Sequence, residues 1–419
     1  MKLGEILSLV RGNTYKSALL SDTEGPFLLG LGSIERGGGF KNANLKRYPG
    51  PSDNRILLHP GDIYVSLKDL TQSCDLLGAV SRVPCNVPEG RLTQDTVKLE
   101  FAEHASNREM QYTYWSLRTP QYRSYCKARG TGTTNMSLSR SDFLAWKLPP
   151  FTPTHDSLIS LFESIESKIT LNNRLNGYLE ELADSLFRDM FGGQGDNATL
   201  ADVAAITMGQ SPAGDSYNEE GVGAVFYQGR GEFGWRFPMQ RLFTTEPRRT
   251  ASADDVLMSV RAPVGDLNVA YEDCCIGRGL AAISSEHHSF CLYLMRSLKK
   301  KLDAFNGEGT VFGSINGRAL NGLSIYAPPS GAINSFEIRI SPVDKLVRTN
   351  EAENRNLEAL RDSLLPKLMT GEIDVSKIDL TRLNSHLASL HFAACSFCAI
   401  QAGRKRVSYA LRVKARALQ

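Results

Sequence analysis

The sequence predicts an α+β protein: two similar mixed α/β domains separated by two long helices that form an antiparallel coiled coil. Three observations predict it. The same motifs occur in the same order in both halves of the 419-residue chain. Each half then passes through a Pro-Pro pair into heptad spacing, and each heptad segment carries two asparagines at the same offset. The predicted parts are a first domain at 1–154, a first helix at 155–191, a second domain at 192–341, a second helix at 342–379 and a basic tail at 380–419.

Internal repetition covers most of the chain. Three motifs of the first half return in the second half, in the same order. The period is far above the roughly 20–50 residues of solenoid repeats, so it indicates two copies of one domain-plus-helix unit. The pairs are "LGEILSLVRGNTY" (3–15) with "LADVAAITMGQSP" (200–212), "GDIYVSLKD" (61–69) with "DDVLMSVRA" (254–262), and "GTTNMSLSRSDFLAWKLPP" (132–150) with "GTVFGSINGRALNGLSIYAPP" (309–329).

The globular segments mix strand and helix signals. "RILLHPGDIYVSL" (55–67) has a Pro-Gly turn before an apolar run, which predicts a turn and then a strand. "VLMSVRAPVGDLNVAY" (256–271) predicts two strands around a turn. Helical spacing follows in 109–128 and again in 287–305. Each domain is therefore expected to combine strands with helices.

The segments after the Pro-Pro pairs predict the two long helices. Apolar or asparagine side chains repeat every seven residues, which is typical of a coiled-coil seam. Each helix is expected to have about 30 residues and a length of roughly 45 Å. Pro366 is expected to kink the second helix, and Gly371 to end it. The rows are Leu158, Ile165, Asn172, Leu179 and Leu186; Phe162, Ile169, Asn176, Ala183 and Met190; Val343, Asn350, Leu357 and Leu364; and Val347, Asn354 and Leu368, with Arg361 as the misfit.

Asparagines on an apolar seam predict a fixed register. A buried amide needs a hydrogen-bond partner or costs about 1–3 kcal/mol, so two helices with matching amides satisfy each other in one alignment only. The alternative is that these amides face water on ordinary surface helices. Antiparallel pairing would relate the two domains by an approximate two-fold axis, which suits duplex DNA. The residues predicted to pair the helices are Asn172, Asn176, Leu179, Leu186, Asn350, Asn354, Leu357 and Leu364.

Motifs for catalysis are not found in the sequence. It has no GxxxxGK[ST] phosphate loop, and "GLGSIERGGG" (30–39) has the wrong spacing for a dinucleotide fingerprint. "KLPPF" and "YAPPS" lack the acid or amide of a DNA amino-methyltransferase loop, and no His-Glu-x-x-His motif occurs. Among eight cysteines, only Cys395 and Cys398 form a CxxC, without a second pair, so free thiols are expected. The sequence predicts no catalytic residue, no metal site and no bound cofactor.

Composition indicates a cytoplasmic protein. No run of about 18 apolar residues indicates a membrane span, and "MKLGEILSLVRGNTY" is too polar for a secretory signal. The net charge of +3 depends on the basic tail at 380–419, so charge alone does not predict nucleic-acid binding.

Basic side chains near turns are the candidate DNA contacts. Phosphate contacts give affinity and base-edge contacts give specificity. The two domains differ most in two glycine-containing loops, 30–50 and 228–249, as expected if each domain reads a different short sequence. The candidates are Arg36, Lys41, Lys46, Arg47, Arg129, Arg140, Arg230, Arg236, Arg248, Arg249, Arg261 and Arg278.

Five segments together resemble the specificity subunit of type I restriction–modification systems. The resemblance covers nearly all of residues 1–379. Arg361 and the basic tail depart from the family's pattern. The segments are "DDVLMSVRAPVGDLNVA" (254–270), "CIGRGLAAI" (275–283), "GEGTVFGSINGRALNGLSIYAPP" (307–329), "IESKITLNNRLNGYLEELADSLFRDMF" (165–191) and "ENRNLEALRDSLLPKLMTGEIDV" (353–375).

The resemblance implies a non-catalytic DNA-recognition subunit. Each target-recognition domain would read half of a split sequence in double-stranded DNA. The helices would set the spacer and dock two modification (methyltransferase) subunits. Adenine methylation from S-adenosylmethionine would belong to those partners, and ATP- and Mg-dependent translocation and cleavage to restriction subunits. The alternatives are a self-sufficient DNA methyltransferase or nuclease, and a coiled-coil scaffold without DNA contact.

Overall fold

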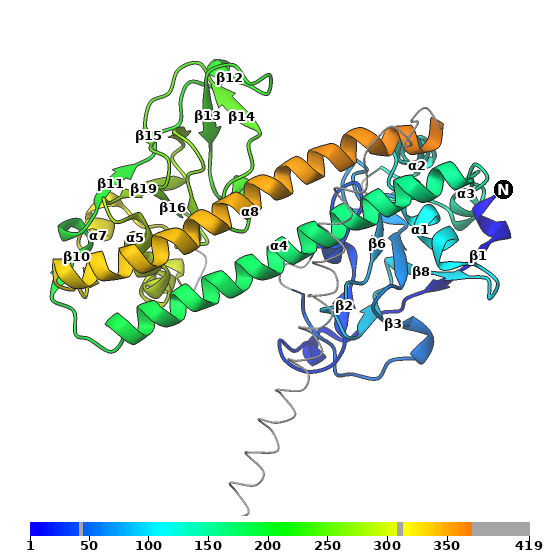
Figure 1. The fold of residues 1–419 in the computed structure, drawn as a ribbon, viewed down its shortest axis with the longest axis horizontal. Helices are drawn as coiled ribbons and strands as arrows, with labels where there is room; N and C mark the ends of the chain where they lie inside the picture. The colour runs from blue at the N-terminus through cyan, green and yellow to red at the C-terminus, as the bar shows by residue number, and fades with distance from the viewer. Residues whose placement is uncertain (42–44, 134, 308–312, 371–419) are drawn as a thin grey trace, which may run out of the picture. The chain divides into compact units, whose positions relative to one another are not determined.

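The computed structural model describes residues 1–419 except 42–44, 134, 308–312 and 371–419 (Figure 1). It divides into two compact units, each of which is described by itself. The first unit combines Met1–Leu171 with the described chain from 353 to 370, and the second is Asn172–Ala352. The predicted tail at 380–419 and the helix stop at Gly371 lie outside the described residues.

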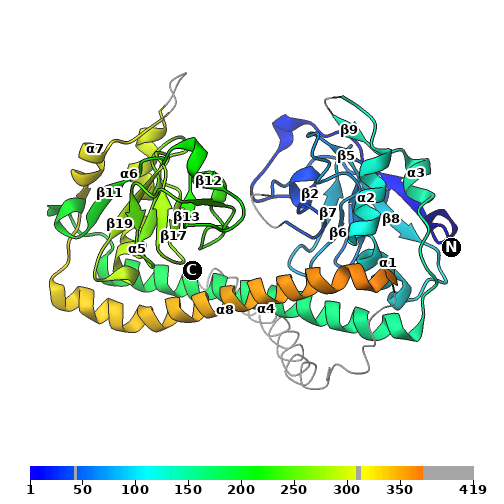
Figure 2. The same cartoon turned by 90° about the horizontal axis from the view of Figure 1, so that it is seen from above.

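The first unit is built on an antiparallel four-stranded sheet. Its order is β1 (Leu7–Arg11), β8 (Thr96–Phe101), β4 (Ile63–Ser66), β6 (Val80–Arg82). A second sheet has the order β2 (Phe27–Leu29), β7 (Gly90–Leu92), β3 (Leu57–Leu58), in which β2 and β7 run parallel. β5 (Lys68–Asp69) pairs with β9 (Met136–Ser137). Figure 2 shows the helices beside these strands, namely α1 (Asn107–Ser116), α2 (Pro120–Arg129) and α3 (Arg140–Leu144).

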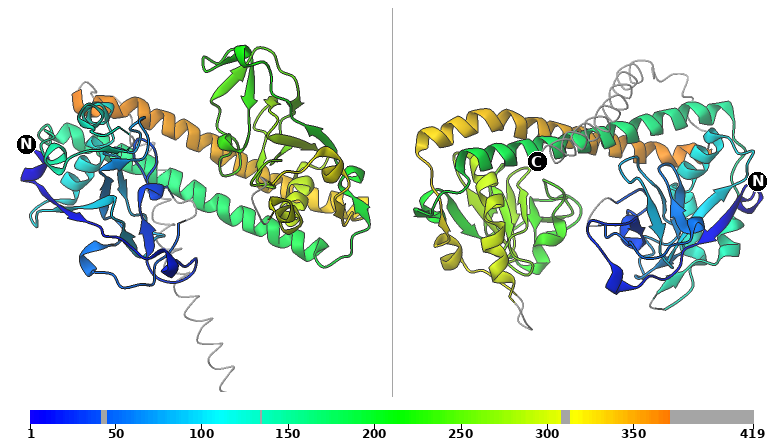
Figure 3. Two further views of the ribbon diagram at one scale, coloured as in Figure 1. Left: turned by 180° about the vertical axis from the view of Figure 1, so that it is seen from behind. Right: turned by 90° about the horizontal axis from the view of Figure 1, so that it is seen from below.

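The second unit repeats this plan. Its four-stranded sheet has the order β11 (Ala205–Met208), β19 (Leu280–Ser284), β16 (Val256–Ser259), β17 (Leu267–Val269). Its second sheet has the order β12 (Tyr217–Asn218), β14 (Leu242–Thr244), β13 (Ala224–Tyr227), β18 (Cys274–Ile276), β15 (Thr250–Ala251). β10 (Ala198–Thr199) pairs with β20 (Ser324–Ile325). The helices are α5 (His288–Ser297), α6 (Lys299–Asp303) and α7 (Gly317–Asn321), and Figure 3 shows the unit from two further sides.

Matching pairings confirm that the two domains are similar. β1, β8, β4 and β6 correspond in order and direction to β11, β19, β16 and β17. The parallel pair β2–β7 corresponds to β13–β18. Gly12 and Gly209 occupy the same place after the first strand, where a Cβ atom would overlap the carbonyl oxygen of Thr93 or of Gly277. The sequence echo between 3–15 and 200–212 thus marks one backbone frame used twice.

Short 3₁₀ helices complete the described elements. They lie at Leu3–Glu5, Ser17–Leu19, Leu31–Ser33, Asn54–Ile56, Leu200–Asp202, Gly214–Ser216, Arg230–Glu232 and Ala304–Asn306.

The two long helices are longer than predicted. α4 spans Pro153–Phe191, with 39 residues, and α8 spans Ser330–Thr370, with 41. At about 1.5 Å per residue each is roughly 60 Å long. The predicted start of the second helix at 342 is wrong by twelve residues, because Ile333, Phe336 and Ile340 extend the helical spacing into the domain core. α8 continues through Pro366 to Thr370.

Both long helices contribute to the core of each unit. In the first unit, Phe162 and Ile165 of α4 share a core with Trp115 of α1 and with Leu364 of α8. In the second unit, Phe187 of α4 contacts Phe290 of α5 and Phe336 of α8 at ring-centroid distances of 5.8 and 5.4 Å. The helices therefore belong to the folded domains, because their apolar faces complete both cores.

Within each unit the two helices run antiparallel. In the first unit, Glu166 of α4 lies 3.7 Å from Arg361 and Lys168 lies 3.1 Å from Glu353. In the second unit, Asn176 bonds Asn350, and Phe187 packs against Phe336. Partner numbers on α8 fall as numbers on α4 rise, which is the predicted direction. The supercoil of a coiled coil stays a prediction. Among the described residues, no helix is both long and apolar enough to span a membrane.

Candidate nucleic-acid interface

The loop at residues 30–50, here the first variable loop, carries four of the predicted basic residues. Arg36 is 84% exposed, and its Nε lies 4.0 Å from Asp75. Lys46 Nζ is 2.6 Å from Asp22, and the Arg47 guanidinium stacks 4.0 Å from the centre of the Phe27 ring. Lys41 is exposed, next to residues 42–44, which are not described. Arg36 and Lys46 lie at the surface, where their ion pairs hold them only weakly and leave them able to meet phosphates, whereas Arg47 is half-buried.

The loop at residues 228–249, here the second variable loop, also carries exposed arginines. Arg230 forms an ion pair with Asp266, and Arg248 lies 4.0 Å from Glu246. Arg249 is exposed, while its backbone carbonyl accepts a hydrogen bond from Ile276 N in β18. Arg278 follows two residues after Ile276, so the second sheet places Arg249 and Arg278 on neighbouring segments.

Three further predicted arginines lie apart from these loops. Arg129 ends α2, with its guanidinium 3.9 Å from the Tyr125 ring centre. Arg140 is the first residue of α3 and is exposed. Arg261 is exposed, and its backbone bridges to Ser314. The structure does not gather all predicted residues of a domain into one cluster, and their DNA contacts stay a prediction.

Arg236 is a correction, because it is buried. Its side chain is only 4% exposed. Nη1 donates to Asp344 at 3.1 Å, and Nη2 donates to Glu180 at 3.0 Å. Burial acts to lower the pKa of Arg236, but Tyr293, Asp344 and Glu180 outweigh it and hold the pKa above its ordinary value. A guanidinium that is already paired with buried carboxylates of the same chain is not available to a phosphate, so the prediction that Arg236 contacts DNA is wrong.

Sequence reasoning missed two buried arginines of the first domain. Arg91 in β7 is 1% exposed and donates to neutral acceptors, among them Ser52 Oγ and Thr14 O. Arg118, 8% exposed, follows α1 and donates to Glu166 of α4. The sequence did contain a signal for Arg118: "YTYWSLR" (112–118) matches "FCLYLMR" (290–296), and the matching Arg296 donates to Asp184 of α4.

The predicted asparagines are buried, which excludes the water-facing alternative. Asn172, Asn176, Asn350 and Asn354 are between 0% and 7% exposed. In the second unit, Asn350 Nδ2 donates to Asn176 Oδ1 at 2.7 Å. Asn176 Nδ2 in turn donates to Glu351 at 3.0 Å. The predicted leucines join the domain cores, with Leu179 and Leu186 in the second unit and Leu357 and Leu364 in the first.

The misfit Arg361 has a partner on the facing helix of the first unit. Its side chain is 14% exposed, and it lies 3.7 Å from Glu166 and 2.8 Å from Asp362. A long basic side chain is tolerated at this seam position because a carboxylate of α4 neutralises it.

α4 also presents an exposed apolar face. Leu175, Tyr178 and Leu182 recur at helical spacing and are 38%, 37% and 50% exposed. In the same unit, Ile338 and Leu346 of α8 are 75% and 42% exposed. Exposed apolar groups that follow one helix face are typical of a protein-binding surface.

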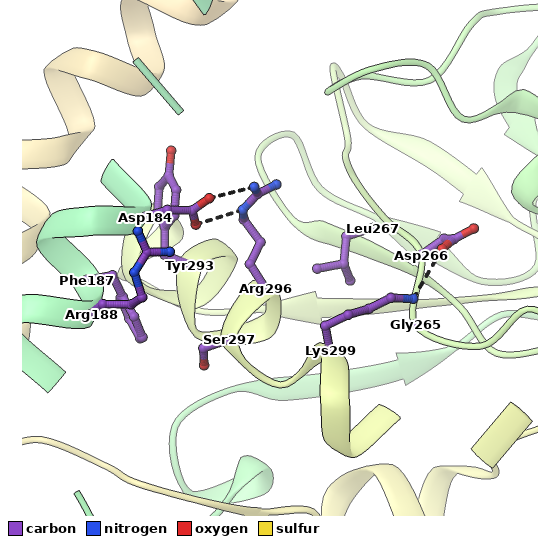
Figure 4. A pocket seen from close by; sticks show the side chains of 10 residues that line it. All are labelled: Asp184, Phe187, Arg188, Gly265, Asp266, Leu267, Tyr293, Arg296, Ser297 and Lys299. Carbon is purple, nitrogen blue, oxygen red and sulfur yellow. Dashed lines mark hydrogen bonds and ion pairs between the residues drawn. The ribbon is translucent and has the colours of Figure 1, made fainter. Parts of the chain in front are cut away.

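Two pockets open in the second unit. The first has a volume of about 380 Å³ and lies between α4, α5 and the turn before β17 (Figure 4). Its cations already face carboxylates: Arg296 pairs with Asp184, and Lys299 with Asp266. The second pocket, of about 420 Å³, is lined by Arg230 and Asn268 and shares Asp266. Among the described residues, no three His, Cys, Asp or Glu side chains are placed to hold a metal ion.

Comparisons with known proteins agree with the resemblance seen in the sequence. No family model matches the chain. Over 174 residues it is 38% identical to the putative type I restriction enzyme MjaX specificity subunit of Methanocaldococcus jannaschii, a match that spans 41% of each protein. Over 133 residues it is 25% identical to the type I restriction enzyme HindI specificity subunit of Haemophilus influenzae, which is 30% of this chain and 29% of that one.

A solved structure aligns over a longer range. The S subunit of a type I restriction–modification system from M. genitalium covers 88% of this chain and 95% of its own, at 16% identity and a TM-score of 0.48. The chain spans less than half the length of each of the two curated relatives named above. Over these segments the predicted resemblance is confirmed: the chain is similar to specificity subunits of type I restriction enzymes.

Proposed function

We propose that this chain is the sequence-specific DNA-recognition and scaffold subunit of a type I restriction–modification complex. The observation that supports the proposal most is that both domains have the same arrangement of strands but different variable loops. The two four-stranded sheets share strand order, whereas the variable loops differ in sequence and in the placing of their arginines. A repeated frame with different exposed loops suits a protein that reads two different short sequences. The relatives' names support the same function.

Each domain has its own half of the target in this proposal. The target-recognition domain at 1–154 reads one half-site and that at 192–341 reads the other. α4 and α8 set the spacer between the half-sites, since both helices pass from one unit to the other. The candidate DNA contacts are Arg36, Lys41, Lys46, Arg47, Arg129, Arg140, Arg230, Arg248, Arg249, Arg261 and Arg278.

The chemistry in this proposal belongs to partner chains. Two modification subunits dock on the long helices and methylate adenine with S-adenosylmethionine. Restriction subunits use ATP and Mg for translocation and cleavage. The proposed role of this chain is binding and positioning, without a catalytic residue or bound cofactor of its own, and its proposed location is the cytoplasm, with the cellular DNA. The exposed face at Leu175, Tyr178 and Leu182 is the proposed docking surface for a modification subunit.

A domain exchange tests the proposed function. Methylome sequencing of a host that carries the full chain and its modification subunits should reveal one bipartite methylated sequence. Replacing residues 1–154 with the matching domain of a related subunit should then change one half of that sequence only. A change in both halves would contradict the two-reader proposal.

The catalytic alternative has a separate test. Purified chain is mixed with DNA and radiolabelled S-adenosylmethionine, with and without the modification subunits. The proposal expects methyl transfer only when those subunits are present. Transfer by the chain alone would instead favour a self-sufficient methyltransferase.

A further inference from the structure

In each domain, a buried arginine connects the variable loop to a long helix. In the second unit this is Arg236, which lies within the second variable loop. It donates to Glu180 of α4, to Asp344 of α8 and to the Tyr293 hydroxyl, at 3.0, 3.1 and 3.4 Å. Its own carbonyl accepts a hydrogen bond from Val269 N of β17. This single residue therefore fixes the loop against both helices and the first sheet of its unit.

In the first unit the buried arginine lies outside the variable loop and bonds to the backbone of that loop. Arg118 follows α1, lies over the Trp115 ring at 4.8 Å and donates to Glu166 of α4 at 3.4 Å. Its Nη2 donates to the Gly38 carbonyl of the first variable loop at 3.3 Å. Gly38 has a φ of +110°, and a Cβ atom there would lie 3.2 Å from Arg118 Cγ. Glycine thus lets the loop backbone pass over the arginine.

The two arginines occupy different positions in the repeat. The residue that matches Arg118 is Arg296, which donates to Asp184 and Glu180 of α4; it shares Glu180 with Arg236, and among the described residues no hydrogen bond joins it directly to the second variable loop. The loop-to-helix link has therefore been built twice from different residues. A feature of the shared frame would instead be expected at matching positions.

Stability alone does not account for these buried groups. Taking a guanidinium out of water is unfavourable, and apolar residues of similar volume often stabilise a fold as well as a buried ion pair does. Among the described buried atoms, Arg236 Nε has no hydrogen-bond partner, so the cluster is not fully satisfied. What such a cluster supplies is orientation, because several charged hydrogen bonds are satisfied together in one geometry only.

We infer that Arg236 and Arg118 are positioning residues for DNA recognition: each holds its own variable loop at a fixed orientation on the long helices and so determines how sharply that domain discriminates between half-site sequences. The inference rests on the proposed function. It assigns the two residues an indirect role, since neither arginine is exposed to DNA.

Methylation at near-cognate sites tests this inference. The full chain is expressed with its modification subunits, and methylation is compared at cognate sites and at sites with one changed base pair. Arg236→Met should reduce this ratio at least about tenfold in the half-site read by residues 192–341, and leave the other half-site unchanged. Arg118→Met should do the reverse. Arg236→Lys should lie between, because an ammonium does not reproduce the fork of a guanidinium.

Matched controls remove one ion pair in each unit outside the two arginine clusters. Arg108→Met loses the bonds to Asp156 and Ser160 of α4, and Lys301→Met loses the bond to Asp196. Both controls should keep wild-type discrimination. If Arg236→Met does not fold, the double variant Arg236→Met/Asp344→Asn replaces it in the test. Asp344→Asn removes the buried negative charge that Arg236→Met leaves without its partner.

Three outcomes distinguish a failure of the positioning inference from a failure of the proposed function. Loss of discrimination confined to one half-site supports positioning. Unchanged discrimination, or equal loss in both half-sites, overturns it. A wild-type complex that methylates no bipartite sequence overturns the proposed function instead.

Discussion

The described cysteines behave as small apolar side chains. All six are free, and five of them are buried: Cys74, Cys126, Cys274, Cys275 and Cys291. Burial raises the pKa of Cys126 to about 11, and that of Cys274 and of Cys291 to about 12. The thiolate is the nucleophile in alkylation, so these groups are doubly protected, by burial and by protonation. Cys85 is exposed. Cys395 and Cys398, the CxxC pair, lie outside the described residues.

We therefore predict selective labelling of Cys85. Iodoacetamide at pH 8 should alkylate Cys85 in the folded chain and leave Cys126, Cys274 and Cys291 unmodified, as read by mass spectrometry of peptides. The same reaction in denaturant should modify all four, which serves as the control. Equal labelling of Cys126 and Cys85 in the folded chain would show that the core around α2 opens readily.

At the scale of secondary-structure elements, the clearest feature is the asparagine pair that joins α4 to α8. Asn176 and Asn350 are 0% and 7% exposed and bond one another at 2.7 Å. We predict that Asn350→Leu alone destabilises the protein by about 1–3 kcal/mol, because it leaves the buried Asn176 amide without this donor. Replacing both asparagines with leucine should recover most of that loss, since two apolar side chains can pack at the seam.

A double-mutant cycle measures this coupling. Urea unfolding followed by circular dichroism should give a coupling energy of about 0.5–3 kcal/mol between the two positions. Additive losses would mean that the amides act independently. A cycle at Leu186 and Leu357, which lie in different units, is the uncoupled control.

The exposed face of α4 carries a second element-scale prediction. Leu182 is 50% exposed, so Leu182→Asp should change stability by no more than about 0.5 kcal/mol. If this face binds a modification subunit, the charge should strongly weaken copurification of that subunit with the tagged chain. Leu70→Asp makes the same change at a leucine that is 63% exposed in the first domain, and it should leave copurification intact. Equal recovery with both variants would place the docking surface elsewhere.

At the scale of the whole molecule, repetition made the domains and helices predictable. The echo of 3–15 in 200–212 predicted two similar frames, and the heptads that carry Asn176 and Asn350 predicted antiparallel partners. The surroundings of individual side chains were harder to predict from the sequence. Arg236 looked like its exposed neighbours because its acidic partners, Glu180 and Asp344, lie 56 and 108 residues away. Likewise, Ile333 gave no sign that α8 starts inside the domain, since its contacts are tertiary.

The helices themselves carry the last prediction, that their length sets the DNA spacer. Inserting about four residues into α4 near Asn172 adds roughly 6 Å and about one helical turn, so the apolar faces on both sides stay in phase. Methylome sequencing should then show both half-sites unchanged and a longer spacer between them. The matched control inserts four residues in the exposed loop at 219–222 of the second unit, which lengthens the chain without lengthening a helix. An unchanged spacer in the helix variant, with methylation retained, would mean that something other than α4 fixes the distance between the half-sites.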